Sequence, residues 1–257
     1  MRKPLLAGNW KMYKVSGEAV SLVEGLRKNL ADVTEREVLV CPPFTALSAV
    51  QKVLSGSTIK LGAQNMSWES EGAFTGEISP AMLKDSGCSY VIIGHSERRQ
   101  YFQETDETVN RKIKSALKFG LTPIVCVGET LEEREKNITF KILERQIREG
   151  LAGLSSEESN KIVVAYEPIW AIGTGRTAAP AQAEDVHAFI RKLLKEIAGD
   201  DAAMSIRILY GGSVKPDNIS ELMACENIDG GLIGGASLNV ESFTKIVKYA
   251  DKRSPVK

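Results

Sequence analysis

Eight short runs of apolar or β-branched residues recur along the chain, and longer stretches rich in charge separate most of them. In order, the runs read LLAGN, VLVCPP, IKLGAQN, YVIIGHS, TPIVCVGE, IVVAYEP, IRILYGGS and GGLIGGA. Most are apolar throughout and do not alternate with polar residues. This pattern is typical of strands that are buried on both faces, as in a parallel sheet.

The stretches between the runs have the spacing of amphipathic helices. DETVNRKIKSALKFG (residues 106–120) and EDVHAFIRKLLKEIAG (184–199) place apolar residues three and four positions apart among charged ones. Both end on glycine, a common stop signal just beyond a helix. Buried strands that alternate with such helices predict a parallel sheet covered by helices on its outer side.

Eight strand and helix units in one chain predict closure into a barrel. The 257 residues include no linker rich in Pro, Gly or Ser, and α/β barrels commonly reach this length as one domain. We therefore predict an α/β protein made of a single (β/α)8 barrel domain that spans residues 1–257. A doubly wound open sheet is the alternative that the pattern leaves open.

Charge and the N-terminal segment narrow the classes of partner. Lys plus Arg (33) balance Asp plus Glu (33), so no overall field favours nucleic acid or an anionic membrane, and an anion must be held locally. The first residues, MRKPLLAGNWKMYK, contain no apolar run long enough for a signal peptide or a membrane span. We expect a cytoplasmic protein without nucleic-acid or membrane partners.

Metal and nucleotide motifs are missing from the sequence. The cysteines are scattered and form no C-x-x-C pair, so buried free thiols are expected at Cys41, Cys88, Cys126 and Cys225. No P-loop is present, and GTGRTA lacks the third glycine of a dinucleotide fingerprint. The sequence therefore predicts neither a metal site nor a cofactor.

Polar side chains stand directly after three of the predicted strands: Asn9, Lys11, His95, Glu97 and Glu167. In barrel enzymes the loops after the carboxyl ends of the strands carry the chemistry, so these residues converge on one mouth. Singly, a lysine or glutamate is usually solvated, and a histidine usually has a structural hydrogen bond. Their convergence is what indicates an active site.

The residue types suggest acid–base chemistry. Glu167, stiffened by the following Pro168, suits a general base in a partly dry cleft. His95 precedes a predicted helix start, SERR, whose positive end disfavours an imidazolium and favours a neutral donor. Lys11 offers a positive charge to a phosphate or a developing oxyanion.

Glycines follow the last two predicted strands, in residues 211–213 (GGS) and 234–236 (GGA). Tight turns alone would explain them. Their unobstructed N–H groups, with a short helix start nearby, also suit a phosphate. The strand ends together therefore predict an anion site beside acid–base groups.

Several long segments identify a resemblance. GNWKM, GAFTGEIS, GHSERR, CVGE, AYEPIWAIGTG, YGGSV and GGASL resemble the signature segments of the triosephosphate isomerase family, in the same order and over essentially the whole chain. The resemblance implies a TIM barrel and an intramolecular aldose–ketose isomerase of glycolysis and gluconeogenesis. Its reaction interconverts dihydroxyacetone phosphate and D-glyceraldehyde 3-phosphate through an enediol(ate), without a cofactor.

The resemblance also assigns roles by motif. It implies that Glu167 moves the proton, as the glutamate base of this family does beside its neutral histidine. His95 and Lys11 polarise the substrate oxygens, Asn9 orients the substrate, and Glu97 supports Lys11 and His95. Asn9 and Lys11 also bind substrate. The phosphate contacts fall on Gly173, Ser213, Gly234 and Gly235.

Two further expectations come from the family. Residues 168–178 would form a lid, in which Arg176 replaces the more usual lysine and Ile169 a frequent valine. The loop from Gly72 to Ser79 would reach into a second subunit, giving a homodimer or a dimer of dimers. His187, inside an amphipathic segment, is expected to be structural.

Two other functions are compatible with a barrel and an anion site. An epimerase or synthase acting on a phosphorylated sugar would need different residues at the strand ends, often metal ligands or paired acids. A phosphometabolite-binding protein without catalytic activity would keep the glycines but would not need Lys11, His95 and Glu167 together.

Overall fold

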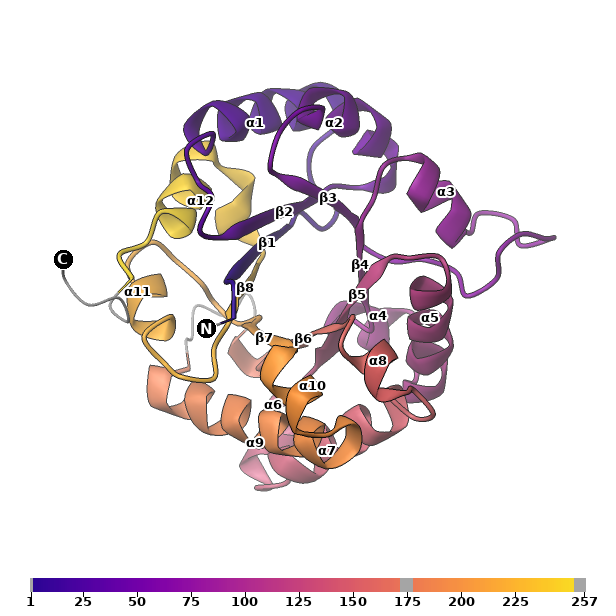
Figure 1. The fold of residues 1–257 in the computed structure, drawn as a ribbon, viewed down its shortest axis with the longest axis vertical. Helices are drawn as coiled ribbons and strands as arrows, with labels where there is room; N and C mark the ends of the chain where they lie inside the picture. Colours follow the sequence, from indigo (N-terminus) through magenta and orange to yellow (C-terminus); the bar gives the residue numbers. More distant parts are fainter. Residues whose placement is uncertain (1, 172–177, 252–257) are drawn as a thin grey trace.

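The computed structural model describes residues 2–171 and 178–251 and contains a closed barrel of eight parallel strands in the order β1 to β8 (Figure 1). Each predicted apolar run overlaps one strand, so the predicted barrel is confirmed and the open sheet is wrong. The strands are β1 Leu5–Asn9, β2 Glu37–Cys41, β3 Lys60–Ala63, β4 Tyr90–Ile93, β5 Thr122–Val127, β6 Val163–Tyr166, β7 Arg207–Tyr210 and β8 Gly230–Ile233.

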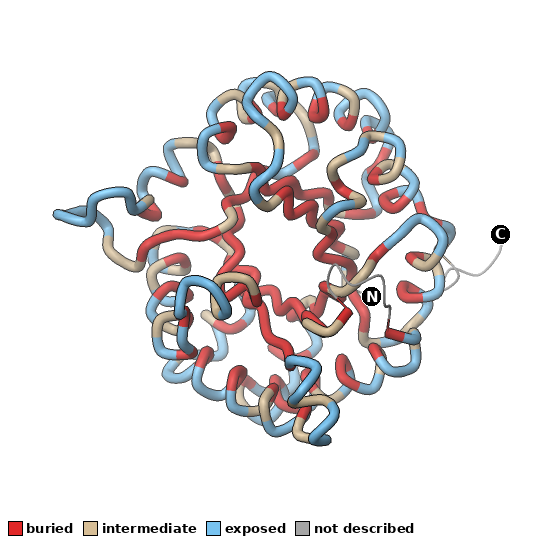
Figure 2. The backbone as a smooth tube through the Cα atoms, turned by 180° about the vertical axis from the view of Figure 1, so that it is seen from behind, coloured by how far each residue is buried: buried red, intermediate tan, exposed pale blue. Residues whose placement is uncertain are grey.

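The barrel closes because β1 pairs with both β2 and β8. Leu5 lies opposite Glu37 on one side and Gly230 on the other. Alternate strand residues fill the interior, among them Leu5, Ala7 and Leu39, while intervening residues such as Leu6 pack against the helices. Figure 2 shows the strands as a buried inner ring. The interior is thus a packed core.

Helices surround the barrel on its outer side (Figure 1). They are α1 Ser16–Asn29, α2 Leu47–Leu54, α3 Pro80–Asp85, α4 Ser96–Tyr101, α5 Asp106–Lys118, α6 Leu131–Glu135, α7 Thr139–Gly150, α8 Ser156–Ser159, α9 Pro180–Ala198, α10 Asp200–Ser205, α11 Ile219–Leu222 and α12 Val240–Val247. Short 3-10 turns, η1 Phe44–Ala46, η2 Ile169–Ala171 and η3 Gly235–Leu238, complete the connections.

Helix boundaries follow the predicted signals. Gly120, beyond α5, has φ 68°, and Gly199, beyond α9, has φ 91°, the positive values that glycine adopts without strain. α9 begins at Pro180, where the missing N–H has no intrahelical partner to lose. α4 begins after His95, as predicted, so a candidate catalytic side chain stands at a helix N-terminus.

Candidate active site

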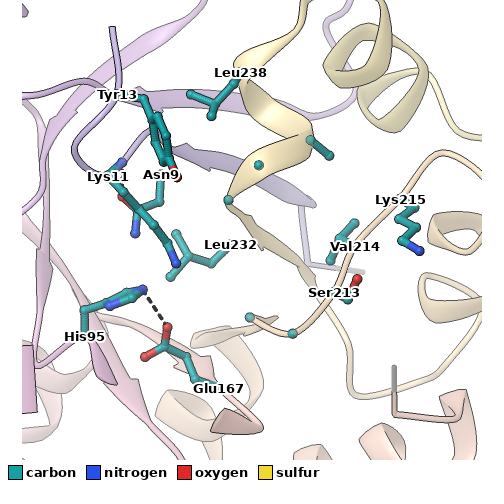
Figure 3. A pocket seen from close by; sticks show the side chains of 15 residues that line it. Asn9, Lys11, Tyr13, His95, Glu167, Ser213, Val214, Lys215, Leu232 and Leu238 are labelled. Carbon is teal, nitrogen blue, oxygen red and sulfur yellow. Dashed lines mark hydrogen bonds and ion pairs between the residues drawn. The ribbon is translucent and has the colours of Figure 1, made fainter. Parts of the chain in front are cut away.

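A cavity of about 420 Å³ opens at the carboxyl ends of the strands (Figure 3). All but two of the predicted site residues line it: Asn9, Lys11, His95, Glu167, Ser213, Gly234 and Gly235. Glu97 contacts two of them from outside the lining, and Gly173 lies outside the described residues. Five different strand ends, those of β1, β4, β6, β7 and β8, therefore meet at one cavity.

Glu167 and His95 lie side by side in the lining of this cavity, with their polar ends directed at each other (Figure 3). Glu167, directly after β6, is 2% exposed, and its Oε1 lies 2.9 Å from His95 Nε2. Its Oε2 accepts a hydrogen bond of 2.9 Å from the backbone N–H of Ser96, the first residue of α4. The carboxylate is thus fixed by two donors from one helix start.

The backbone determines the tautomer of His95. The N–H of Glu97 donates to Nδ1 of His95 at 3.2 Å, and because a backbone N–H can only donate, this Nδ1 carries no proton. The carboxylate of Glu97 lies 3.6 Å from the same nitrogen, beyond hydrogen-bond distance. The ring that satisfies this contact is neutral and carries its proton on Nε2, facing Glu167.

Opposing effects act on both ionisable groups. Burial lowers the pKa of His95, but the adjacent Glu167 carboxylate outweighs burial and raises that pKa above its ordinary value, contrary to the direction expected from the helix start alone. A charged ring would lose the Glu97 N–H bond at Nδ1, so this contact favours the neutral form against that rise. The pKa of Glu167 would rise through burial, yet His95 and the Ser96 N–H hold it below its usual range. Glu167 is therefore ionised at neutral pH despite its burial, as a general base must be.

Lys11 is held in a rare backbone conformation, with φ 49°. Its N–H donates to Oδ1 of Asn9 at 3.1 Å, and its carbonyl accepts from the Gln64 side-chain amide at 2.8 Å. Its ammonium, directed into the cavity in Figure 3, lies 2.5 Å from Oε1 of Glu97. This contact is compatible with the predicted support of Lys11 by Glu97.

Glycines shape the far side of the cavity. A Cβ on Gly211 would lie 2.9 Å from Cγ of Glu167, and one on Gly212 would lie 2.3 Å from the Tyr210 hydroxyl. These close approaches leave the cavity between Glu167 and the β7 and β8 ends open to a small ligand. Gly234 and Gly235 precede and begin η3, whose backbone N–H groups suit an oxyanion.

Glu129 anchors the segment that follows Glu167. This fully buried carboxylate accepts hydrogen bonds from the Tyr166 hydroxyl at 3.1 Å, the Trp170 indole at 2.9 Å and Arg134 at 3.1 Å. The start of the expected lid is therefore tied to the barrel through η2. Its centre, residues 172–177 with Gly173 and Arg176, lies outside the described residues.

The described part of the chain holds neither a metal-binding group of side chains nor a helix that could span a membrane. Among residues 2–171 and 178–251, no group of His, Cys, Asp and Glu side chains could hold a metal ion. No helix in the same residues is long and apolar enough to span a bilayer. His187, expected to be structural, is fully buried beside Tyr166, and burial lowers its pKa to about 3.

Beyond Glu97, three further groups that support the site were not predicted from the sequence. Gln64, Glu129 and the Ser96 N–H each position a cavity residue or its neighbour, and none belongs to a pattern of residue types. Ser96 could have been found, since the position after a predicted N-cap has an unpaired N–H. Gln64 and Glu129 also stand at the ends of predicted strands, in IKLGAQN and TPIVCVGE, but their residue types alone do not reveal their partners.

The closed barrel, with acid–base groups and a glycine-lined cavity at its carboxyl end, defines the class of (β/α)8-barrel enzymes. The sequence profile described as "Triosephosphate isomerase" matches residues 4–250. Triosephosphate isomerases of Endomicrobium trichonymphae and Carboxydothermus hydrogenoformans are each 60% identical, over 97% and 96% of this chain and 100% and 99% of theirs. The chain belongs to the triosephosphate isomerase family.

A solved structure of the same family has the same fold as this chain. The crystal structure of triosephosphate isomerase from Bartonella henselae superimposes with a TM-score of 0.86 at 42% sequence identity. The match covers 95% of this chain and 97% of that one. The resemblance inferred from the signature segments is confirmed.

Proposed function

We infer that this protein interconverts dihydroxyacetone phosphate and D-glyceraldehyde 3-phosphate through an enediol(ate), the aldose–ketose isomerisation of its family in glycolysis and gluconeogenesis. One observation carries the inference: a buried, ionised carboxylate, an imidazole directed at it and a lysine ammonium share one cavity. A binding protein has no need for this combination.

Each group has a role in proton transfer. Glu167 takes a proton from the carbon beside the substrate carbonyl and returns it to the neighbouring carbon. His95 donates from Nε2 to the oxygens that gain charge, and Lys11 stabilises the same charge. Asn9 holds the Lys11 backbone through its Oδ1 and orients the substrate, and Glu97 steadies Lys11 and His95.

The substrate phosphate binds where the glycines leave the backbone open. Ser213, Gly234 and Gly235 supply the contacts, largely as N–H donors at the ends of β7 and β8. In the ligand-free site Glu167 is bonded to His95 and the Ser96 N–H. Substrate that enters between them takes over the Nε2 donor, which frees the carboxylate to approach carbon.

We further propose a single domain over residues 1–257, a cytoplasmic location and self-association. The loop that contains Gly72 to Ser79 projects from the barrel beside α3 (Figure 1), and the exposed apolar side chains Met12, Tyr13 and Phe74 favour a protein partner. A second copy is that partner, in a homodimer or a dimer of dimers.

A coupled assay with glyceraldehyde 3-phosphate tests the reaction, and Glu167→Asp tests the base. The shorter side chain withdraws the carboxylate by about 1 Å, and a misplacement of that size lowers kcat on the order of a hundredfold with little change in KM. Glu157→Asp, at an exposed site, is the matched control and retains full activity. Wild-type turnover in Glu167→Asp would remove Glu167 from the role of base.

A further inference from the structure

Gln146 is a buried amide close to the catalytic cavity but outside its lining. It lies on α7, is 5% exposed, and bonds twice to one residue, Gly128, which follows β5. The Gly128 N–H donates to Gln146 Oε1 at 2.8 Å, and Gln146 Nε2 donates to the Gly128 carbonyl at 3.1 Å. The side chain thus pairs with Gly128 as the backbone of another strand would.

The backbone N–H and C=O of Gly128 have no partner in β4, because the pairing of β4 with β5 ends before Gly128. β4 pairs with β5 up to Ile93 and Val125, and the chain then turns through Gly94 to His95. On the other side, Glu167 N–H donates to Val127 and Ile169 N–H donates to Glu129, at 2.8 and 3.1 Å. Gly128 lies between these two bonds, with its own N–H and C=O satisfied by Gln146.

The same glycine touches the backbone of Glu167. A Cβ on Gly128 would lie 1.8 Å from the Glu167 carbonyl oxygen, so no other residue fits without moving one of the two segments. Glu167 prevents the Gly128 peptide from moving inward, and Gln146 prevents it from moving outward. The backbone position of the proposed base is therefore set from α7, through Gly128.

The packing of α7 against the barrel does not require an amide side chain at position 146. α7 already buries Leu143 and Ile147, so an apolar residue at position 146 would dock the helix equally well. A buried amide is costly unless it is hydrogen-bonded, and this one makes both of its bonds to the backbone of a single residue, Gly128. We infer that Gln146 is a positioning residue for Glu167, an inference that rests on the base role proposed above.

Substitution of Gln146 by Met removes both hydrogen bonds and keeps an unbranched side chain of similar length. Gln146 also lines an outer cavity of about 820 Å³, which gives the new side chain room. Without the two hydrogen bonds from Gln146, the backbone of Gly128 shifts, and the backbone of Glu167 shifts with it. We expect kcat to fall roughly 10- to 100-fold, the range that follows from a displacement of up to about 1 Å, with KM changed less than about threefold.

Asn110 provides a matched control. Its side chain also donates two hydrogen bonds to backbone carbonyls, those of Gly150 and Ala152, each at 2.9 Å, but it does not line the catalytic cavity. Asn110→Leu should lower Tm comparably and leave kcat unchanged. If Gln146→Met lowers Tm as the control does and retains kcat within twofold, the positioning role is wrong.

A double-mutant cycle separates this proposal from the base assignment. If Gln146 acts through Glu167, the fold-loss of kcat in the double mutant Gln146→Met/Glu167→Asp is smaller than the product of the two single fold-losses. A double-mutant loss equal to that product contradicts the positioning role. Wild-type kcat in Glu167→Asp alone overturns the base assignment instead. Should Gln146→Met not fold, Gln146→Asn, whose shorter amide cannot reach Gly128, replaces it in the cycle under the same criteria.

Discussion

A single backbone angle places the lysine of the site. Lys11 has φ 49°, a left-handed conformation that costs a residue with a Cβ roughly 1–2 kcal/mol, so its neighbours must hold it there. Gln64 does this by donating to the carbonyls of both Lys11 and Cys41, at 2.8 and 2.9 Å. From this backbone position the Lys11 side chain lines the cavity.

Gln64→Leu tests the hold on Lys11. Both carbonyls lose their donor, Lys11 relaxes toward ordinary backbone angles, and its ammonium moves away from the substrate. We expect kcat/KM to fall about tenfold, since about 1.4 kcal/mol of strain or lost stabilisation corresponds to a factor of ten. Steady-state kinetics measure this beside Gln51→Leu on α2 as control. Unchanged kcat/KM in a folded Gln64→Leu protein would contradict the role.

The contrast between Lys11 and its support shows what the sequence can predict. Apolar runs fix where each strand ends, so the sequence alone places Asn9, His95 and Glu167 at one mouth of the barrel. It does not reveal what Gln64 and Gln146 bind, because their partners are backbone atoms, which have no sequence signature. Glu129 bonds to Tyr166 across 37 positions, and only the fold brings these two together.

The strands also carry a polar cluster at their opposite ends. Glu37, Tyr90 and Arg207 are the first residues of β2, β4 and β7. The Tyr90 hydroxyl donates to Glu37 at 2.7 Å, and Arg207 donates to Glu37 at 2.7 Å and to Tyr90 at 2.9 Å. These strands are not neighbours, so the cluster ties distant parts of the barrel together.

This cluster should make the barrel sensitive to alkali. Burial is the main reason that the pKa of Tyr90 rises to about 12, whereas an unfolded tyrosine titrates near pH ~10. A raised folded pKa gives stability that is complete below pH ~10 and is lost as pH rises toward 12. Tyr90→Phe should therefore be less stable at pH ~8, yet lose less stability between pH ~10 and ~12.

Denaturant unfolding at a series of pH values measures this difference. Tyr101→Phe, at an exposed position on α4, is the control and should follow the wild-type dependence. Wild-type and Tyr90→Phe proteins that lose equal stability over this interval would show that other groups govern the alkaline transition.

At the scale of the whole molecule, apolar side chains are exposed in the segment that follows Lys11 and in the projecting loop. Met12, Tyr13 and Val15 follow Lys11 along the chain and are 95%, 59% and 70% exposed. Phe74, in the projecting loop, is 49% exposed. Exposed large apolar side chains in these two segments favour a protein partner. A second copy would cover them if its projecting loop packed beside the residues that follow Lys11.

Thr75→Arg tests this assembly, because Thr75 is exposed at the tip region of the projecting loop and a charge there would be buried without a partner in the dimer. An unpaired buried charge costs several kcal/mol, enough to separate the subunits at micromolar concentration. We expect light scattering to give the mass of one chain, with a native circular dichroism spectrum and reduced kcat, because Lys11 loses the packing beside it. Thr58→Arg, just before the opposite end of β3, should remain assembled and active. A Thr75→Arg protein that keeps the mass of two or more chains and full activity would place the interface elsewhere.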